Sequence, residues 1–209
     1  PQVSIEIGTY RGGSLQVLSH FSQKVFSVDV DPTVEQRIGN MFQNVEYRCG
    51  LSHTLLPEIF LEVQTQDLDV EFILVDGDHS ERGVRRDLES LLHFVPRKPC
   101  VVVMHDSFNP DCREGIKAAD WPSSPYVQWV ELDFIPGVYH HTAYDTASAR
   151  TMWGGFACAV LGPDVRQGTL SIQASQQHVF EAVFAGSAHA RPQKPFWEKI
   201  SSLIGRLRT

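Results

Sequence analysis

The stretch Ile5-Glu6-Ile7-Gly8-Thr9-Tyr10-Arg11-Gly12-Gly13-Ser14 places an apolar strand directly before a glycine-rich turn and the start of a helix. Gly8 allows the backbone to bend where the strand ends, and Gly12 allows a ligand to approach the main chain closely. Ser14 is placed to cap the helix, whose free N–H groups then face the same pocket. The stretch therefore predicts a nucleotide-binding corner. Its candidate ligand-binding residues are Glu6, Gly8, Thr9, Tyr10, Gly12 and Ser14.

The spacing of these glycines differs from that of two common phosphate-binding motifs. It is neither the G-x-G-x-x-G of dinucleotide enzymes nor the G-x-x-x-x-G-K-[ST] that grips phosphates, and no lysine follows it. Glu6 would repel a phosphate but can hold a cationic or hydroxyl-bearing ligand. The corner therefore favours a nucleoside without a phosphate at this position.

Apolar runs alternate with helical patterns over residues 3–162, as a mostly parallel sheet with helices on both faces requires. The clearest helix contains Val84, Leu88 and Leu91 at helical spacing, with charges on its other face. The predicted strands are Val3–Ile7, Val25–Asp29, Val45–Cys49, Val70–Val75, Cys100–Met104, Val127–Leu132 and Phe156–Leu161. The predicted helices are Ser14–Phe21, Thr33–Met41, Thr54–Gln64 and Glu81–Phe94.

The last two predicted strands have no helix between them, which is typical of an antiparallel hairpin. Their connection, residues 133–154, then hangs over the carboxyl edge of the sheet, and long loops there are usually lids or binding loops. We expect its rings, with those of the loop after residue 104, to suit a flat or sugar-like acceptor. These side chains are Phe108, Trp121, Tyr126, Phe134, Tyr139, His140, His141, Tyr144 and Trp153. His140 and His141 are poor candidates for one metal, since adjacent side chains of an extended chain point apart.

Residues 163–209 carry a weaker pattern and are predicted to form a helical appendage to the domain of residues 1–162. A helix is expected over residues 171–185, and a basic amphipathic helix over residues 195–207. The first predicted strand begins almost at Pro1, so we expect that an N-terminal part of the domain precedes it.

Charge and cysteine content narrow the class of protein. The net charge is −7, and residues 191–209 carry +4 of it, which leaves −11 for residues 1–190. An acidic body disfavours a nucleic-acid partner, because neutralising phosphates needs Lys and Arg. The four cysteines form no C-x-x-C pair, and no apolar run approaches 18 residues, so we expect a cytoplasmic protein with buried thiols and no membrane span. The oligomeric state stays open, a homo-oligomer included.

Two polar residues follow the second and third predicted strands. Asp29 ends an apolar run about 20 residues after the glycine turn, where a carboxylate can accept hydrogen bonds from both hydroxyls of a ribose. Asp31, followed by Pro32, is explained equally well as a helix cap. Ser52 lies where an adenine would pass, although a helix cap explains it as well.

The densest polar cluster lies at the ends of the fourth and fifth predicted strands. Asp76 ends one apolar run, and His105 and Asp106 end the next. Neighbouring strand ends can converge on one divalent ion, with carboxylates suiting Mg²⁺ and an added imidazole suiting Mn²⁺ or Fe²⁺ better. His79, three residues after Asp76, is placed to take a proton from a substrate hydroxyl. The candidate catalytic residues are His79 and Asp106, and the candidate metal ligands are Asp76, His105 and Asp106. Asp76 also faces the expected cofactor.

The pattern D-G-D-H-S at residues 76–80, R-D-L at 86–88 and H-D at 105–106 resembles that of a bacterial branch of the class I S-adenosylmethionine-dependent methyltransferases. This branch includes macrolide-sugar O-methyltransferases and relatives of the cephalosporin-hydroxylase type. The resemblance covers about residues 3–162 and implies a Rossmann-like α/β fold with a seven-stranded, mostly parallel sheet and an antiparallel final hairpin. It also implies S-adenosylmethionine as cofactor, Mg²⁺ (or Mn²⁺) at Asp76 and Asp106, and His79 as base. His105 stands where the family has an acidic residue.

Three functions fit these features. The first is O-methylation of a hydroxyl on a small molecule, a sugar or secondary metabolite, assisted by a divalent metal. The second is a metal-dependent hydrolase or oxygenase that uses the Asp and His residues alone, which leaves the glycine turn and Asp29 without a role. The third is a non-catalytic adenosyl-binding domain, since a fold alone does not determine function.

Overall fold

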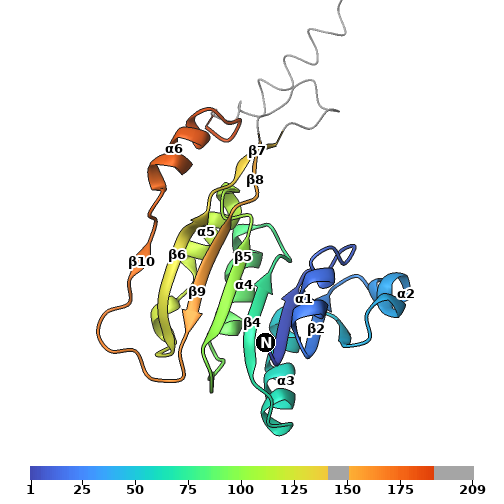
Figure 1. Cartoon of the computed structure of the whole chain (residues 1–209). Helices are drawn as coiled ribbons and strands as arrows, with labels where there is room; N and C mark the ends of the chain where they lie inside the picture. The colour runs from blue at the N-terminus through green and yellow to red at the C-terminus, as the bar shows by residue number, and fades with distance from the viewer. Residues whose placement is uncertain (141–150, 191–209) are drawn as a thin grey trace, which may run out of the picture.

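The computed structural model describes residues 1–140 and 151–190, with only the backbone of Tyr139 and His140. Its strands are β1 (Val3–Ile7), β2 (Lys24–Asp29), β3 (Val45–Cys49), β4 (Val70–Val75), β5 (Cys100–His105), β6 (Val127–Ile135), β7 (Val138–His140), β8 (Thr151–Trp153), β9 (Phe156–Leu161) and β10 (Ile172–Gln173). Eight of them form one sheet in the order β10-β6-β9-β5-β4-β1-β2-β3, and β7 pairs with β8 in a separate ribbon (Figure 1). Within the sheet β9 runs antiparallel to both neighbours, β5 and β6, whereas the other pairs are parallel.

The helices cover both faces of this sheet, as predicted. They are α1 (Leu15–Phe21), α2 (Val34–Ile38), α3 (Ser52–Thr65), α4 (Glu81–Leu91), α5 (Pro110–Ala118) and α6 (Gln177–Ala185), with short 3-10 turns at Gly39–Met41 and Trp121–Ser123. The two faces can be told apart in β2, because side chains alternate along a strand. Val25 packs with Leu15 and Ile38 in one buried cluster, while Phe26 and Val28 belong to the larger core. Helices α1 and α2 therefore cover one face, and α3 to α5 the other.

The sheet departs from the predicted seven strands, because the short strand β10 adds an eighth. Ile172 pairs in parallel with Val130 of β6, and Gln173 pairs with Glu131. The sequence gives no sign of β10, since it has only two residues and both are exposed. Because β10 takes up Ile172 and Gln173, the helix predicted to start at Ser171 begins later, at Gln177. Strand β6 also extends three residues beyond its predicted end, to Ile135.

Helix α5 lies where the sequence predicted a loop after the fifth strand. Its start carries a clear signal, because the Asn109 side chain accepts hydrogen bonds from the N–H groups of Asp111 and Cys112, and Pro110 occupies the first turn. Gly115 interrupts the helical pattern. A Cβ at that position would lie 2.6 Å from the Glu81 carbonyl oxygen, so the glycine lets α5 pack closely on α4.

The part of the predicted appendage that the structure describes, residues 163–190, lies beside the sheet. In addition to the pairing of β10 with β6, the Arg113 guanidinium of α5 binds Asp133 of β6 at 2.7 Å and the Gln177 side chain of α6 at 2.8 Å. The Arg113–Asp133 pair is buried. The boundary at residue 162 stays a prediction, and the basic helix expected over residues 195–207 lies outside the described residues. No helix within the described ranges is long and apolar enough to cross a membrane.

The strand order changes direction between β1 and β4, which is where open α/β sheets bind ligands. From β1 the chain proceeds to β2 on one side, and β4 lies on the other. The backbone N–H of Asp76, just after β4, donates to the Ile7 carbonyl of β1 at 2.8 Å. Gly8 follows with φ +87°, and a Cβ there would collide with the carbonyl oxygen of Asp76. The missing side chain at Gly8 therefore lets the ends of the two strands touch.

Replacing Gly8 by alanine should destabilise the fold, because the added methyl group meets backbone and the positive φ is strained for any other residue. We expect Gly8→Ala to lower the free energy of unfolding by about 2 kcal/mol or more. Gly13→Ala is the matched control, since no atom lies within 4 Å of the position of an added Cβ, and its effect should stay within about 0.5 kcal/mol. Denaturant unfolding of the two variants measures both. Equal effects would show that contact between the ends of β1 and β4 does not constrain the fold.

Candidate active site at the carboxyl edge of the sheet

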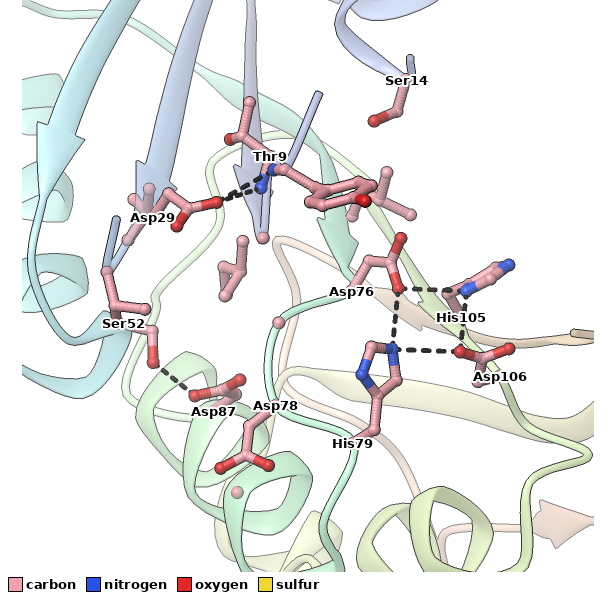
Figure 2. A pocket seen from close by; sticks show the side chains of 18 of the residues that line it. Thr9, Ser14, Asp29, Ser52, Asp76, Asp78, His79, Asp87, His105 and Asp106 are labelled. Carbon is pink, nitrogen blue, oxygen red and sulfur yellow. Dashed lines mark hydrogen bonds and ion pairs between the residues drawn. The ribbon is translucent and has the colours of Figure 1, made fainter. Parts of the chain in front are cut away.

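A cavity of about 1280 Å³ opens at the carboxyl ends of β1, β2, β4 and β5. The glycine turn, residues 8–14, forms one part of its wall, and the residues that follow β4 and β5 form another. Figure 2 shows Asp29 and Thr9 on one side and Asp76, His79, His105 and Asp106 on the other. The topology thus brings together residues separated by nearly 100 positions in the sequence.

The Asp29 carboxylate organises the glycine turn. One oxygen, Oδ2, accepts hydrogen bonds from the backbone N–H groups of Thr9 at 2.8 Å and Tyr10 at 3.0 Å. The other oxygen, Oδ1, accepts from the N–H of Asp31 at 2.8 Å. Tyr10 has φ +49°, which is unusual for a residue other than glycine. The carboxylate therefore holds the turn in a strained conformation and still lines the cavity.

Three predicted residues of the turn lie differently from expectation. Ser14 lines the cavity, as predicted, but its side chain does not cap α1 and instead donates to the buried Glu6 carboxylate. Glu6 is fully buried and is not part of the cavity wall; burial raises its pKa to about 7, against the effect of the Ser14 hydrogen bond. Gly12 is also absent from the wall. A Cβ there would lie 2.7 Å from Cδ1 of Ile38, so Gly12 makes room for α2 rather than for a ligand.

Ser52 lines the cavity, as expected, but its hydroxyl is already used. It donates to the carboxylate of Asp87, a residue of α4 that is buried and also lines the cavity. Burial raises the pKa of Asp87, against the effect of this bond. Asp87, part of the R-D-L pattern at residues 86–88, was not among the predicted site residues. Its position in phase with the apolar residues Val84 and Leu91 of the buried helix face indicates that it points inward.

Four side chains, Asp76, His79, His105 and Asp106, form what we call the Asp/His cluster. One oxygen or nitrogen atom from each lies within 4.8 Å of the corresponding atom of every other. Asp76 Oδ1 lies 3.0 Å from His105 Nδ1 and 3.4 Å from His79 Nε2. Asp106 Oδ2 lies 3.2 Å from His105 Nδ1 and 3.0 Å from His79 Nε2. The donor atoms therefore alternate around a ring of two oxygens and two nitrogens.

The backbone and neighbouring rings hold the Asp/His cluster in place. Asp106 has φ +57°, and its second oxygen, Oδ1, accepts from the Gly154 N–H at 2.5 Å, so Oδ2 faces the cluster. The His79 ring lies edge-on to Trp153 at 5.7 Å between centroids, and the His105 ring lies 4.9 Å from Phe156. Trp153 and Phe156 both line the cavity. Phe156 was not predicted to line the cavity, because it begins a strand and the predicted cavity rings were all in loops.

Opposite charges shift the pKa values of the cluster. Hydrogen bonds to Asp106 and then Asp76 raise the pKa of His79 to about 9 and that of His105 to about 10. Burial alone would raise the pKa of Asp106, but the hydrogen bonds from both histidines hold it well below its usual range. The pKa of Asp76 is lowered by the same partners, again against burial. The contacts between these side chains thus favour the charged forms of both the imidazoles and the carboxylates.

Other aromatic residues expected over the cavity lie elsewhere. Phe108 and Trp121 are buried in the protein interior, since α5 occupies the region predicted as loop. Phe134 is half exposed, and neither Phe134 nor Tyr126 lines the cavity. Trp153 is the predicted ring that does. The side chains of Tyr139 and His140, and the whole of His141 and Tyr144, lie outside the described residues.

Comparison with known proteins points to one kind of domain. Residues 5–107, just under half of the chain, match the family model of a methyltransferase domain. The matched part runs from β1 to the residue after Asp106, so it contains the glycine turn and the whole Asp/His cluster. No curated protein is similar enough to count as a match.

Solved structures that resemble this chain have very different sequences. A putative hemolysin from Streptococcus thermophilus is 13% identical, with a TM-score of 0.55 over 87% of this chain and 64% of that one. A putative hemolysin from Lactococcus lactis is 11% identical, with a TM-score of 0.52 over 87% of this chain and 86% of that one. The N-methyltransferase NodS from Bradyrhizobium japonicum, in complex with S-adenosylhomocysteine, is 12% identical, with a TM-score of 0.46 over 78% and 79%. At these identities the likeness to the two hemolysins concerns the fold alone.

Proposed function

We propose that this protein is an S-adenosylmethionine-dependent methyltransferase of class I that methylates a hydroxyl of a small molecule, such as a sugar or secondary metabolite. The observation that carries the proposal is the shared cavity, which joins a glycine turn held by Asp29 to a cluster of acid–base groups. The family match to a methyltransferase domain over residues 5–107 supports the transfer of a methyl group. The resemblance to bacterial macrolide-sugar O-methyltransferases supports a hydroxyl acceptor.

The charge of the cavity wall suits this cofactor. Outside the Asp/His cluster, whose carboxylates face imidazoles, four acidic residues outnumber the two arginines, Arg11 and Arg86; they are Asp29, Asp31, Asp78 and Asp87. S-adenosylmethionine carries a positive sulfonium and an ammonium group, which such a wall attracts, whereas a nucleoside phosphate would be repelled. The acidic wall also argues against a nucleic-acid acceptor.

The structure narrows how Asp29 would bind the adenosyl group. A carboxylate has about four acceptor positions, and three are taken by the N–H groups of Thr9, Tyr10 and Asp31. One position remains, so we propose that Asp29 accepts a hydrogen bond from one ribose hydroxyl directly. The adenine would then lie near Ser52, and the sulfonium end would point toward Asp76.

The acceptor hydroxyl must lose a proton during transfer, and we propose that the Asp/His cluster receives it. That His79 is the base stays a prediction with one condition: its ring nitrogen must first lose the proton that Asp106 and Asp76 stabilise. A divalent metal at Asp76, His105 and Asp106 would lower the pKa of a bound hydroxyl when present. The protein residues position the acceptor in line with the methyl group, which is the main contribution of such a site.

The alternative of a metal-dependent hydrolase or oxygenase has one specific observation in its favour. The Asp/His cluster offers two imidazoles and two carboxylates at one point, a donor set that hydrolytic and oxidative metal sites also use. It gives no role to the ordered glycine turn or to the match with a methyltransferase domain. We therefore rank it second.

We also propose a cytoplasmic location. All four cysteines are free thiols, and Cys100, Cys112 and Cys158 are buried. Unpaired buried thiols are typical of proteins of reducing compartments.

Binding of S-adenosylhomocysteine tests the cofactor part of the proposal. Calorimetry should show a dissociation constant of about 1 μM, or about −8 kcal/mol. Asp29→Ala should weaken binding by about 1.5–3 kcal/mol, because it removes the ribose acceptor and releases the turn. Asp31→Ala is the matched control: its carboxylate lies on the same wall but binds Thr33 and Arg37, and it should change affinity by less than about 1 kcal/mol. A wild-type protein that does not bind would contradict the proposal.

Methyl transfer from labelled S-adenosylmethionine tests the hydroxyl preference. In a panel of sugars and phenols with their amine analogues, label should accumulate on hydroxyl-bearing acceptors as base-stable ethers. His79→Ala should lower turnover by about 10²–10⁴-fold. His93→Ala, which changes an exposed histidine away from the cavity wall, should not. Preferred labelling of the amines, or a fully active His79→Ala variant, would overturn the respective assignment.

A further inference from the structure

The donor atoms of the Asp/His cluster disagree with the magnesium ion that the family resemblance implies. Mg²⁺ is held by oxygen ligands and keeps several waters, whereas half of the donors here are imidazole nitrogens. Imidazole favours transition metals such as Fe²⁺, Co²⁺, Ni²⁺ and Zn²⁺. The disagreement originates at His105, which occupies the position of an acidic residue in the resembled pattern.

The spacing of the four donor atoms matches that of ligands around one ion. Two ligands at about 2.1 Å from a metal lie about 3.0–3.4 Å apart when they occupy neighbouring positions in octahedral or tetrahedral geometry. The Asp/His cluster has four such contacts, of 3.0, 3.4, 3.2 and 3.0 Å between an oxygen and a nitrogen. His79 Nε2 belongs to this set as fully as His105 Nδ1, so it is placed as a ligand.

The surroundings of the cluster are those of a prepared metal site. The Gly154 N–H fixes Asp106 by binding the oxygen that faces away from the cluster. Trp153 and Phe156 pack against the two imidazole rings and restrict their rotation. Outer contacts of this kind orient the ligands of metal centres. The Asp76, His79 and His105 side chains are each about one third exposed to the cavity, with values of 32%, 42% and 31%, which leaves one side of the site open to a small molecule.

We infer that Asp76, His79, His105 and Asp106 together bind one transition-metal dication of the series from Mn²⁺ to Zn²⁺, in preference to Mg²⁺. The inference concerns the site of the proposed function, but it depends on the donor atoms and not on methyl transfer. It gives His79 the role of a ligand while the ion is bound, so His79 can act as the base proposed above only when the site holds no ion. The two imidazoles then set the preference for a transition metal. The open side of the site lets a further small ligand reach the ion.

Equilibrium metal binding tests this inference on the whole chain, prepared with a chelator and without a polyhistidine tag. One equivalent of Co²⁺ should bind at least about 100-fold more tightly than Mg²⁺, with visible d–d absorption bands from nitrogen and oxygen ligands. His79→Ala and His105→Ala should each lower Co²⁺ affinity at least about tenfold. His105→Asp should lower the preference for Co²⁺ over Mg²⁺, because it restores an oxygen ligand.

His53→Ala is the matched control, since His53 lines the same cavity but lies outside the Asp/His cluster; it should keep the Co²⁺ affinity of the wild type. Circular dichroism shows whether each variant folds. If His105→Ala does not fold, His105→Asn takes its place. Equal affinity for Mg²⁺ and Co²⁺, or Co²⁺ binding that survives the changes at His79 and His105, would overturn the inference. A titration with S-adenosylhomocysteine on the same samples separates this outcome from failure of the proposed function. If Co²⁺ binds but S-adenosylhomocysteine does not, the inference about the metal site stands and the proposed methyltransferase function is rejected.

Discussion

The contact between the ends of β1 and β4 is the constraint on which the candidate site depends. The Asp76 N–H binds the Ile7 carbonyl, and the Gly8 backbone lies against the Asp76 carbonyl without room for a side chain. Because these strands adjoin at the point where the strand order reverses, the glycine turn and the Asp/His cluster share one cavity. Any larger residue at Gly8 would push the glycine turn away from the Asp/His cluster.

Electrostatics connects the two sides. Asp29 accepts three hydrogen bonds from backbone N–H groups, two from the glycine turn and one from Asp31, so the main role of its charge is to hold the backbone. In the cluster, Asp76 and Asp106 are neutralised by His79 and His105, which explains the raised pKa values of both histidines. A dication bound at the same four side chains would likewise offset the two carboxylate charges, with both imidazoles neutral.

Much of this arrangement could be predicted from the sequence, because its signals are local. The predicted bounds of β1, β3, β4 and β9 agree with the structure, since polar or glycine residues lie directly before and after each strand. That Asp76 and Asp106 converge also followed from their places at the ends of β4 and β5, which are neighbours in a parallel sheet. The misses concern long-range contacts. Strand β10 is defined only by its pairing with β6. Helix α5 was missed because Gly115 weakens the local helical pattern, whereas in the structure it allows α5 to pack closely against α4. The partners of Ser14 and Ser52 are likewise carboxylates distant in the sequence.

The central claim is that nucleoside cofactor and metal bind side by side in one cavity. Nuclear relaxation of S-adenosylmethionine labelled with ¹³C at its methyl group tests this most directly, because bound Mn²⁺ accelerates relaxation only of nearby nuclei. The account predicts strong enhancement at the methyl carbon when Mn²⁺ is added to the complex, and its loss in the doubly substituted His105→Ala, Asp106→Asn protein. A methyl signal that Mn²⁺ leaves unchanged, while both ligands are bound, would contradict it.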